Sequence, residues 1–320
     1  MKNPKLPTLT DILEAHQRIK DIINCTPVHT SRSLNHALQS QLFFKCENFQ
    51  RVGAFKFRGA SNKLERLITE IRPDIVATHS SGNHAAALAL AAKEKHLGCQ
   101  VVMPENSPPV KIEAVRGYGA EITFCKPTLV ARETTLKEIV EKTHAVFVHP
   151  YNDFDIIAGQ GTAALELLEE VPELNCIIAP VGGGGLLSGT SIVARSLKPG
   201  IQIFGAEPAG ADDAFRSIKA GKIIPSINPN TIADGLLTSL GDLTFNCITR
   251  YADDILRVSE TSILEAMKYL YERMKLVIEP SGCVPLAAVM EYPQKFKSLK
   301  TGIILSGGNI DFSSLSSFLG

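Results

Sequence analysis

The sequence CIIAPVGGGGLLSG spans residues 176–189 and joins an apolar run of strand length to a segment of helical composition. Four consecutive glycines lie between the two. Such a loop lets several backbone N–H groups converge on an anion, and the dipole of the following helix adds a partial positive charge. A plain tight turn needs fewer glycines, because each one raises the entropy cost of folding. The stretch therefore predicts an α/β unit with an anion-binding loop.

The strand–loop–helix pattern recurs along the chain. Apolar runs of strand length occur at 42–46, 75–78, 101–103, 121–125, 145–148, 176–181, 201–206 and 302–305. Helical patterns occur at 109–115, 163–170, 261–274 and 285–290, and Thr10 is expected to cap a first helix. This alternation predicts parallel sheets with right-handed crossovers. We expect an α/β fold of two domains, each a twisted, mainly parallel sheet covered by helices, with the chain crossing between them more than once.

Length and composition restrict the class of protein. The 320 residues suggest about two domains of about 150 residues each. The 33 basic and 33 acidic side chains balance, which argues against a nucleic-acid partner and gives no reason to expect an anionic membrane surface. The longest unbroken apolar run, 85–92, is shorter than the roughly 20 residues of a membrane-spanning helix. Seven scattered cysteines without a CxxC pair predict reduced thiols in a cytoplasmic protein.

A dinucleotide site is the first alternative for the glycine loop. Gly183, Gly185 and Ser188 give GxGxxS, which lacks the third glycine of the dinucleotide fingerprint. Glu207, however, follows the next strand at about the 20-residue spacing of the acidic residue that such a site requires. The loop alone leaves both interpretations open. A Walker loop is excluded because no GK[ST] closes the segment.

A lysine lies between two aromatic residues in GAFKFRGA, residues 53–60. Apolar surroundings disfavour the charged amine, so the pKa of Lys56 would fall and the amine would become nucleophilic, as a Schiff-base lysine requires. Taken alone, the segment favours a surface lysine whose stem lies along apolar surface. SSGNH, residues 80–84, precedes an alanine-rich helix and offers N–H groups suited to a carboxylate, or simply a helix cap. SGGN, residues 306–309, also fits a plain turn.

Together these segments resemble the pyridoxal phosphate (PLP) enzymes of the tryptophan synthase β-subunit type, or fold type II. They are most similar to the branch of serine/threonine dehydratases and serine racemases. HPYND (149–153), AGQGT (158–162), EPAGADD (207–213), ADG (233–235) and IEPSG (278–282) also resemble that branch. The resemblance covers nearly the whole chain. It implies a large cofactor-binding domain of residues 1–68 and 149–320, a small mobile domain of residues 69–148, and a homodimer.

The resemblance also assigns a cofactor site. Lys56 would bind PLP as a Schiff base and move the Cα proton of the substrate on one face. The N–H groups of a loop would hold the phosphate, namely those of Gly182, Gly183, Gly184, Gly185 and Leu186. Phe55 would pack beside the ring, Asn83 would bond the ring hydroxyl, and Ser306 would bond the pyridine nitrogen. A neutral hydroxyl partner does not force that nitrogen to be protonated.

Substrate and metal sites are likewise implied by the resemblance. The SSGNH loop would bind the substrate carboxylate through Ser80, Ser81, Gly82, Asn83 and His84, and Ser81 would be the racemase base opposite Lys56. Glu207, the carbonyl of Ala211 and Asp213 would bind a divalent cation, and such oxygen ligands suit Mg²⁺ or Ca²⁺. The alternative is that Asp212 or Asp213 caps the following helix.

The expected activity is a PLP-dependent dehydratase (ammonia-lyase) of L-serine or L-threonine that gives a 2-oxo acid and ammonia. Serine racemase is the first alternative, and both activities could coexist because both start with loss of the Cα proton. A 3-hydroxyaspartate dehydratase is a second, in which Arg132 would meet the second carboxylate, although a surface role for Arg132 is favoured. Ala54, Ala85 and Thr238 depart from residues common in the family, which bears on substrate preference. A dinucleotide-dependent reductase is the alternative from another class.

Overall fold

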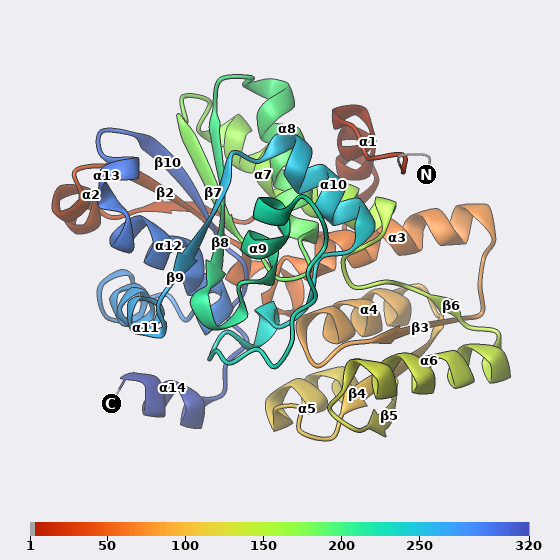
Figure 1. Cartoon of the computed structure of the whole chain (residues 1–320). Helices are drawn as coiled ribbons and strands as arrows, with labels where there is room; N and C mark the ends of the chain where they lie inside the picture. Colours follow the sequence, from red (N-terminus) through yellow and green to blue (C-terminus); the bar gives the residue numbers. More distant parts are fainter. Residues whose placement is uncertain (1–3, 320) are drawn as a thin grey trace.

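The computed structural model describes residues 4–319 and contains two β-sheets (Figure 1). The larger has the order β1-β2-β10-β7-β8-β9, and the smaller β5-β4-β3-β6. Among the strands within residues 4–319, only β1 runs antiparallel to its neighbour. The strands of the larger sheet are β1 (Val28–Thr30), β2 (Gln41–Cys46), β7 (Cys176–Pro180), β8 (Gln202–Pro208), β9 (Asp254–Val258) and β10 (Lys300–Leu305). This architecture confirms the predicted α/β fold with two mainly parallel sheets.

Helices cover both faces of the larger sheet. Along β7, Ile177 contributes to one buried apolar cluster and Ile178 to another, because successive strand residues face opposite sides. One face packs against α7 (Phe154–Glu170) and α8 (Gly185–Leu197) and the other against α12 (Pro280–Glu291). The remaining elements around this sheet are α1 (Leu9–Ile19), α2 (Arg32–Leu38), η1 (Glu47–Phe49), η2 (Arg51–Gly53), α3 (Lys56–Glu70), η3 (Ala209–Ala211), α9 (Asp213–Ala220), η4 (Asp234–Leu236), α10 (Asp242–Tyr251), α11 (Glu260–Tyr269), η5 (Leu270–Met274), α13 (Pro293–Phe296) and α14 (Phe312–Leu319).

The smaller sheet forms a separate layer at the lower right of Figure 1. Its strands are β3 (Ile75–His79), β4 (Gly98–Pro104), β5 (Glu121–Cys125) and β6 (Val146–Phe147). Three helices pack around it, namely α4 (Asn83–Glu94), α5 (Pro109–Gly117) and α6 (Leu129–Thr143). The chain enters this layer after α3 and returns to the larger sheet through α7, so it crosses between the sheets twice. The domain boundaries at 68 and 148, and the mobility of the smaller domain, stay predictions.

Several elements differ from those expected. The first helix is capped by Thr8, whose side chain accepts the N–H of Asp11, so the expectation of Thr10 as the cap was wrong. The helix expected at 163–170 begins at Phe154 and that at 285–290 at Pro280. Both N-terminal halves contain glycine or proline, which weakens a helical pattern in sequence. The short strands β1 and β9 were missed.

Two sequence-level observations have structural counterparts. All seven cysteines are free, and all except Cys25 are buried. Within residues 4–319, no helix combines the length and the apolar character that crossing a membrane requires.

Candidate active site

Lys56 opens α3 and points toward the segment that precedes α7. Its Nζ atom donates a hydrogen bond to the carbonyl oxygen of Pro150 at 2.7 Å and lies 5.2 Å from the centre of the Phe55 ring. Burial lowers the pKa of Lys56 from 10.5 to about 8. The amine therefore loses its proton more easily than a free lysine does, which favours nucleophilic attack. The surface-lysine alternative does not fit this environment.

The glycine loop connects β7 to α8 at the carboxyl edge of the larger sheet. Gly184 has a φ of +86°, which side chains rarely adopt. A Cβ atom at Gly183 would lie 2.3 Å from the Tyr151 ring, and one at Gly182 would lie 2.9 Å from Leu236 Cα. Within residues 4–319, the N–H groups of Gly183 and Gly184 donate to no acceptor, and the first N–H groups of α8 lack intrahelical acceptors. These free donors fit a phosphate, and glycine is needed in the loop because side chains would clash with Tyr151, Leu236 and Leu240.

The loops carrying SSGNH and SGGN meet at Asn83. Asn83 Nδ2 donates to Glu279 Oε1 at 2.6 Å, and Asn83 Oδ1 accepts from Asn309 Nδ2 at 3.0 Å. Asn309 Nδ2 also donates to the carbonyl of Val52 at 2.7 Å. Four segments far apart in the sequence are thereby joined, one of them directly before the GAFKF segment. The second hydrogen of the Asn83 amide is not used by these contacts and could donate to a cofactor hydroxyl.

The GAFKF and SGGN segments also contact each other through the backbone. Phe55 N donates to the carbonyl of Ser306 at 3.0 Å, and Ala54 forms an antiparallel bridge with Gly307. Ser306 is buried directly after β10. These contacts fix the positions of Lys56 and Ser306 relative to each other, as a site that uses both residues requires.

Ser81 does not cap α4. The N-cap is Gly82, and no side chain makes the capping bond, so the capping alternative for Ser81 and Asn83 was wrong. The Ser81 side chain is partly exposed, whereas Ser80 Oγ accepts the N–H of Gly82 at 3.3 Å. His84 is buried, with its Nε2 atom 3.3 Å from the carbonyl of Val148. Among residues 4–319, its Nδ1 atom has no hydrogen-bond partner.

Lys111, which no sequence motif marked, connects the two sheets. Lys111 lies on α5 beside the smaller sheet, and its Nζ atom is 2.5 Å from Asp234 and 3.6 Å from Glu279 in the larger unit. Burial raises the pKa of Glu279 to about 7, against the opposing effect of Lys111. A Cβ at Gly82 would lie 2.6 Å from Lys111 Cδ, so the SSGNH loop packs directly on this lysine. Lys111 belongs to no motif that the sequence shows. Its ion pairs are with Asp234 and Glu279, which lie more than 100 positions further along the chain.

The HPYN segment forms another wall of the site. His149 Nδ1 accepts the N–H groups of Tyr151 at 3.2 Å and Asn152 at 2.9 Å. Burial and the neighbouring His79 lower the pKa of His149 to about 4, so this imidazole is neutral at neutral pH. Tyr151 packs over Gly183, and burial raises the pKa of its phenol. The HPYND motif marked this segment in the sequence but not the role of Tyr151.

The acidic cluster after β8 contains two buried carboxylates, those of Glu207 and Asp213. Glu207 is fully buried and accepts the N–H groups of Ala214 at 3.0 Å and Phe215 at 2.9 Å. Among the described residues, both carboxylate oxygens of Asp213 are buried without a hydrogen-bond partner. Burial raises the pKa of Glu207 to about 9 and that of Asp213 to about 6. Asp212 occupies the N-cap position of α9, as the capping alternative had it, but its side chain makes no capping bond, and Glu207 accepts the first N–H groups instead.

A hard cation fits this cluster. Within the described chain, no group of three or more His, Cys, Asp or Glu side chains surrounds one metal position. A cation between Glu207 and Asp213 would therefore need carbonyl oxygens as well, and Ala211 is buried between them in sequence. Two carboxylates and a carbonyl are ligands of the type that Mg²⁺ and Ca²⁺ accept. The orphaned oxygens of Asp213 are the observation that supports this fit.

The fold and the site define a class of enzyme. Residues 19–307 match the family described as pyridoxal-phosphate dependent enzyme, and the chain belongs to this family. The match favours a single phosphate over a dinucleotide at the glycine loop. The fold type II expected from the sequence is confirmed by solved structures, among them maize serine racemase. The chain is similar to that structure with a TM-score of 0.95 and 46% identity, over 98% of this chain and 97% of the maize chain.

Two curated relatives differ in the activity that their names state. The serine racemase of Dictyostelium discoideum is 51% identical over 316 residues, which cover 98% of each chain. The beta-hydroxyaspartate dehydratase of Paracoccus denitrificans is 47% identical over 310 residues, covering 97% of this chain and 98% of the relative. The family and its cofactor are thereby established, while the substrate is a matter for proposal.

Proposed function

We propose that this chain is a PLP-dependent serine racemase that also dehydrates serine. The sequence motifs favoured a serine/threonine dehydratase, but the relatives support the racemase better. Named serine racemases lie at about half identity over nearly the full chain. A threonine deaminase of known structure is also similar, at 42% identity. The proposal therefore includes elimination from threonine, as an activity found in the family. A homodimer and a cytoplasmic location are part of the proposal by resemblance only.

Lys56 and the glycine loop would hold the cofactor. When bound, PLP supplies an electron sink that acidifies the Cα proton of an amino acid. The free N–H groups of Gly183 and Gly184 would bind the phosphate, together with Gly182, Gly185 and Leu186. Ser306 and Asn83 would meet the ring, and Phe55 would pack against it. Lys56, with a pKa of about 8, would both attach the cofactor and carry a proton, since an amine near its pKa can accept and donate.

Ser81 would be the second proton-transfer residue. Inversion requires delivery of a proton to the face opposite the one that it left, so one lysine is insufficient. Ser81 lies on the SSGNH loop, partly exposed and free of any capping role. The other members of this loop would bind the substrate carboxylate, as Ser80, Gly82 and Asn83 surround the start of α4. A cation at Glu207, Ala211 and Asp213 would stabilise the segment after β8.

The observation that carries this proposal is the Lys56 amine held 2.7 Å from the Pro150 carbonyl, in a chain about half identical to named serine racemases. Its experiment measures D-serine and pyruvate formed from L-serine by wild type, Ser81→Ala and Ser80→Ala. Ser81→Ala should retain much of the dehydration and lose about 10²–10⁴-fold of the inversion. Ser80→Ala, the adjacent matched control, should change both products together. An unchanged ratio of D-serine to pyruvate in Ser81→Ala would remove Ser81 as the second base.

A second candidate function is dehydration of 3-hydroxyaspartate, and Arg132 is the observation that favours it. Among residues 4–319, the Nε atom of Arg132 is buried without an acceptor. Burial and the Arg132 charge lower the pKa of His79 to about 4, and Arg132 also acts on Tyr151. The arginine therefore lies near the site with its charge available for a second carboxylate.

The corresponding experiment compares serine with 3-hydroxyaspartate. Arg132→Gln should reduce kcat/KM for 3-hydroxyaspartate by about 10–100-fold, the effect of a lost charge-assisted hydrogen bond, and leave serine nearly unchanged. Arg116→Gln, which removes a guanidinium on α5 that contacts Phe124, is the control. Equal loss for both substrates would assign Arg132 a structural role only.

A further inference from the structure

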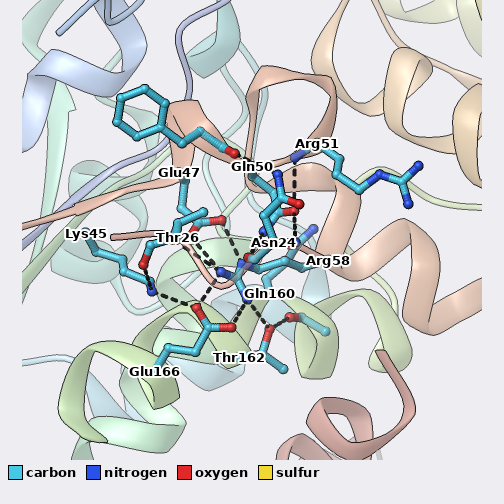
Figure 2. Close-up of polar contacts among 12 residues, drawn as sticks. Asn24, Thr26, Lys45, Glu47, Gln50, Arg51, Arg58, Gln160, Thr162 and Glu166 are labelled. Atoms are coloured by element: carbon cyan, nitrogen blue, oxygen red, sulfur yellow. Dashed lines mark hydrogen bonds and ion pairs between the residues drawn. The ribbon is translucent and has the colours of Figure 1, made fainter. Parts of the chain in front are cut away.

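Four charged side chains are buried together behind the candidate site. They are Lys45 at the end of β2, Glu47 just after it, Arg58 in the first turn of α3 and Glu166 in α7 (Figure 2). Lys45, Glu47 and Arg58 are fully inaccessible and Glu166 nearly so. We name this group the buried charge quartet. None of its members belongs to the sites assigned above.

Arg58 is the centre of the quartet because it binds both carboxylates at two points. Its Nε and Nη2 atoms donate to Glu47 at 2.7 and 2.8 Å, and its Nη1 and Nη2 atoms donate to Glu166 at 2.6 and 2.8 Å. Thr162 accepts a further bond from Nη1 at 3.2 Å. Figure 2 shows the guanidinium between the two carboxylates. Paired forks of this kind fix direction as well as distance.

Lys45 and Thr26 complete the quartet's hydrogen bonds. Lys45 Nζ donates to Glu166 Oε2 and to the carbonyl of Thr26, both at 2.6 Å, while Thr26 Oγ1 donates to Glu47 at 2.6 Å. Two cations thus balance two anions. Burial opposes the charged forms, yet the partners raise the pKa of Arg58 and lower that of Glu166. Every charge has a partner within the protein, so this is not a ligand site.

Stability alone is a poor reason for such a group. Removing ions from water is costly, and apolar residues of similar volume often stabilise a core as well as buried ion pairs do. What a bidentate pair adds is a defined orientation. The quartet therefore matters most for the element on which its central residue lies, which is the first turn of α3.

That turn carries Lys56, two residues before Arg58. The start of α3 has no side-chain cap, since Phe55 occupies the N-cap position in helical conformation. Packing against α7 is very close, because a Cβ at Gly159 would lie 2.6 Å from Gly59 Cα. Arg58 binds Glu166 on α7, and the segment before α7 carries the Pro150 carbonyl that accepts from Lys56. Arg58 thus joins α3 to α7, and Lys56 joins α3 to the segment that leads into α7.

We propose that Arg58, through the buried charge quartet, is a positioning residue that aims Lys56 at the site of its covalent bond with the cofactor. The proposal rests on the proposed role of Lys56 as the Schiff-base lysine. Burial is the cause of the lowered Lys56 pKa, with no contribution from the neutral quartet. The quartet therefore acts through geometry and leaves the basicity of Lys56 unchanged.

The experiment measures how fast cofactor-free protein captures PLP covalently, followed by its visible absorbance across a pH series. Arg58→Lys keeps the charge but cannot form either fork. Its capture rate should fall about 10–100-fold, as expected for a reacting group displaced by about 1 Å. The pH of half-maximal capture should stay at the wild-type value, because the charge of the quartet is preserved.

Two further variants separate positioning from stability. Arg58→Met with Glu47→Gln keeps the interior neutral and retains the pair of Lys45 and Glu166, so it should fold and still capture slowly. Phe296→Leu weakens the core on α13, where Phe296 packs against Phe204. It should lower the thermal midpoint and leave the capture rate at the wild-type value.

Three outcomes would overturn the proposal. One is a wild-type capture rate in folded Arg58→Lys or in the double variant. Another is slowing in Phe296→Leu as large as in the Arg58 variants at equal loss of stability. Failure of both Arg58 variants to fold would make the quartet a requirement of folding and not a positioning device. If wild type itself captures no PLP through Lys56, the proposed function fails, which is a distinguishable result.

Discussion

The Nζ atom of Lys56 lies 2.7 Å from the carbonyl oxygen of Pro150 and joins the first turn of α3 to the segment that leads into α7. A carbonyl accepts a hydrogen bond from either the neutral or the charged amine, so this contact holds the side chain in place in both states. Burial supplies the shift in pKa. Orientation and reactivity of Lys56 therefore have different physical causes, which can be tested separately.

Replacing Lys56 with alanine should abolish covalent capture of the cofactor and lower turnover by at least about 10⁴-fold, since both attachment and proton transfer are lost. The fold should survive, as shown by cooperative thermal unfolding. Lys198→Ala, which removes a lysine that donates to the carbonyls of Pro172 and Leu174, is the control and should retain activity. Covalent capture by Lys56→Ala would show that another amine binds the cofactor.

The rate of cofactor capture should rise with pH and level off above about pH 8, because the folded-state pKa of Lys56 is about 8. Capture by a free alkylamine should instead rise through about pH 10.4. The folded protein also binds fewer protons than the unfolded chain between these two values, so the contribution of Lys56 to the free energy of unfolding increases with pH across that window. A wild-type profile that rises only through pH 10 would contradict burial of the amine.

Two glycine-to-alanine variants should separate backbone strain from phosphate binding. Gly184 and Gly221 both have positive φ, +86° and +65°, but a Cβ at Gly184 would meet Leu240 at 2.7 Å, whereas Gly221 has open space. Gly221→Ala should cost about 1–2 kcal/mol of stability with an unchanged dissociation constant for PLP. Gly184→Ala should in addition weaken PLP binding by about tenfold or more, equivalent to about 1.4 kcal/mol. Equal PLP affinities in the two variants would place the phosphate elsewhere.

The acidic cluster should respond to divalent cations through Asp213. With chelator present, Asp213→Asn should raise the free energy of unfolding by on the order of 1–3 kcal/mol, because it removes a buried charge that has no partner. Mg²⁺ or Ca²⁺ at about 100 times its dissociation constant should stabilise wild type by about 2.7 kcal/mol and leave this variant unaffected.

Asp212→Asn is the matched control for that experiment. Asp212 neighbours the cluster but pairs with Arg216 at 2.7 Å and Arg257 at 3.1 Å. Its replacement should cost a little stability and preserve the response to cations. If wild type shows no thermal shift with either cation, the orphaned oxygens of Asp213 belong to a purely structural cluster.

Local sequence determined the α/β class and the positions of most strands. The run at 121–125 coincides with β5, and the glycine loop at 182–185 lies at the start of α8 as expected. These features depend on backbone conformation and on apolar runs, which each segment carries by itself. The same segments indicated Lys56 and the phosphate loop, because their chemistry depends on near neighbours in sequence.

Only the tertiary structure could decide the contacts that combine these segments. The bond from Asn83 to Glu279 and the pair of Lys111 with Asp234 join residues more than 100 positions apart. The tertiary structure also decided which side chain accepts the first N–H groups of α9. That side chain is Glu207 and not Asp212. The lowered pKa of Lys56 and the balance of charges around Arg58 arise from burial. Burial is a property of the packed chain, and no single segment of the sequence contains it.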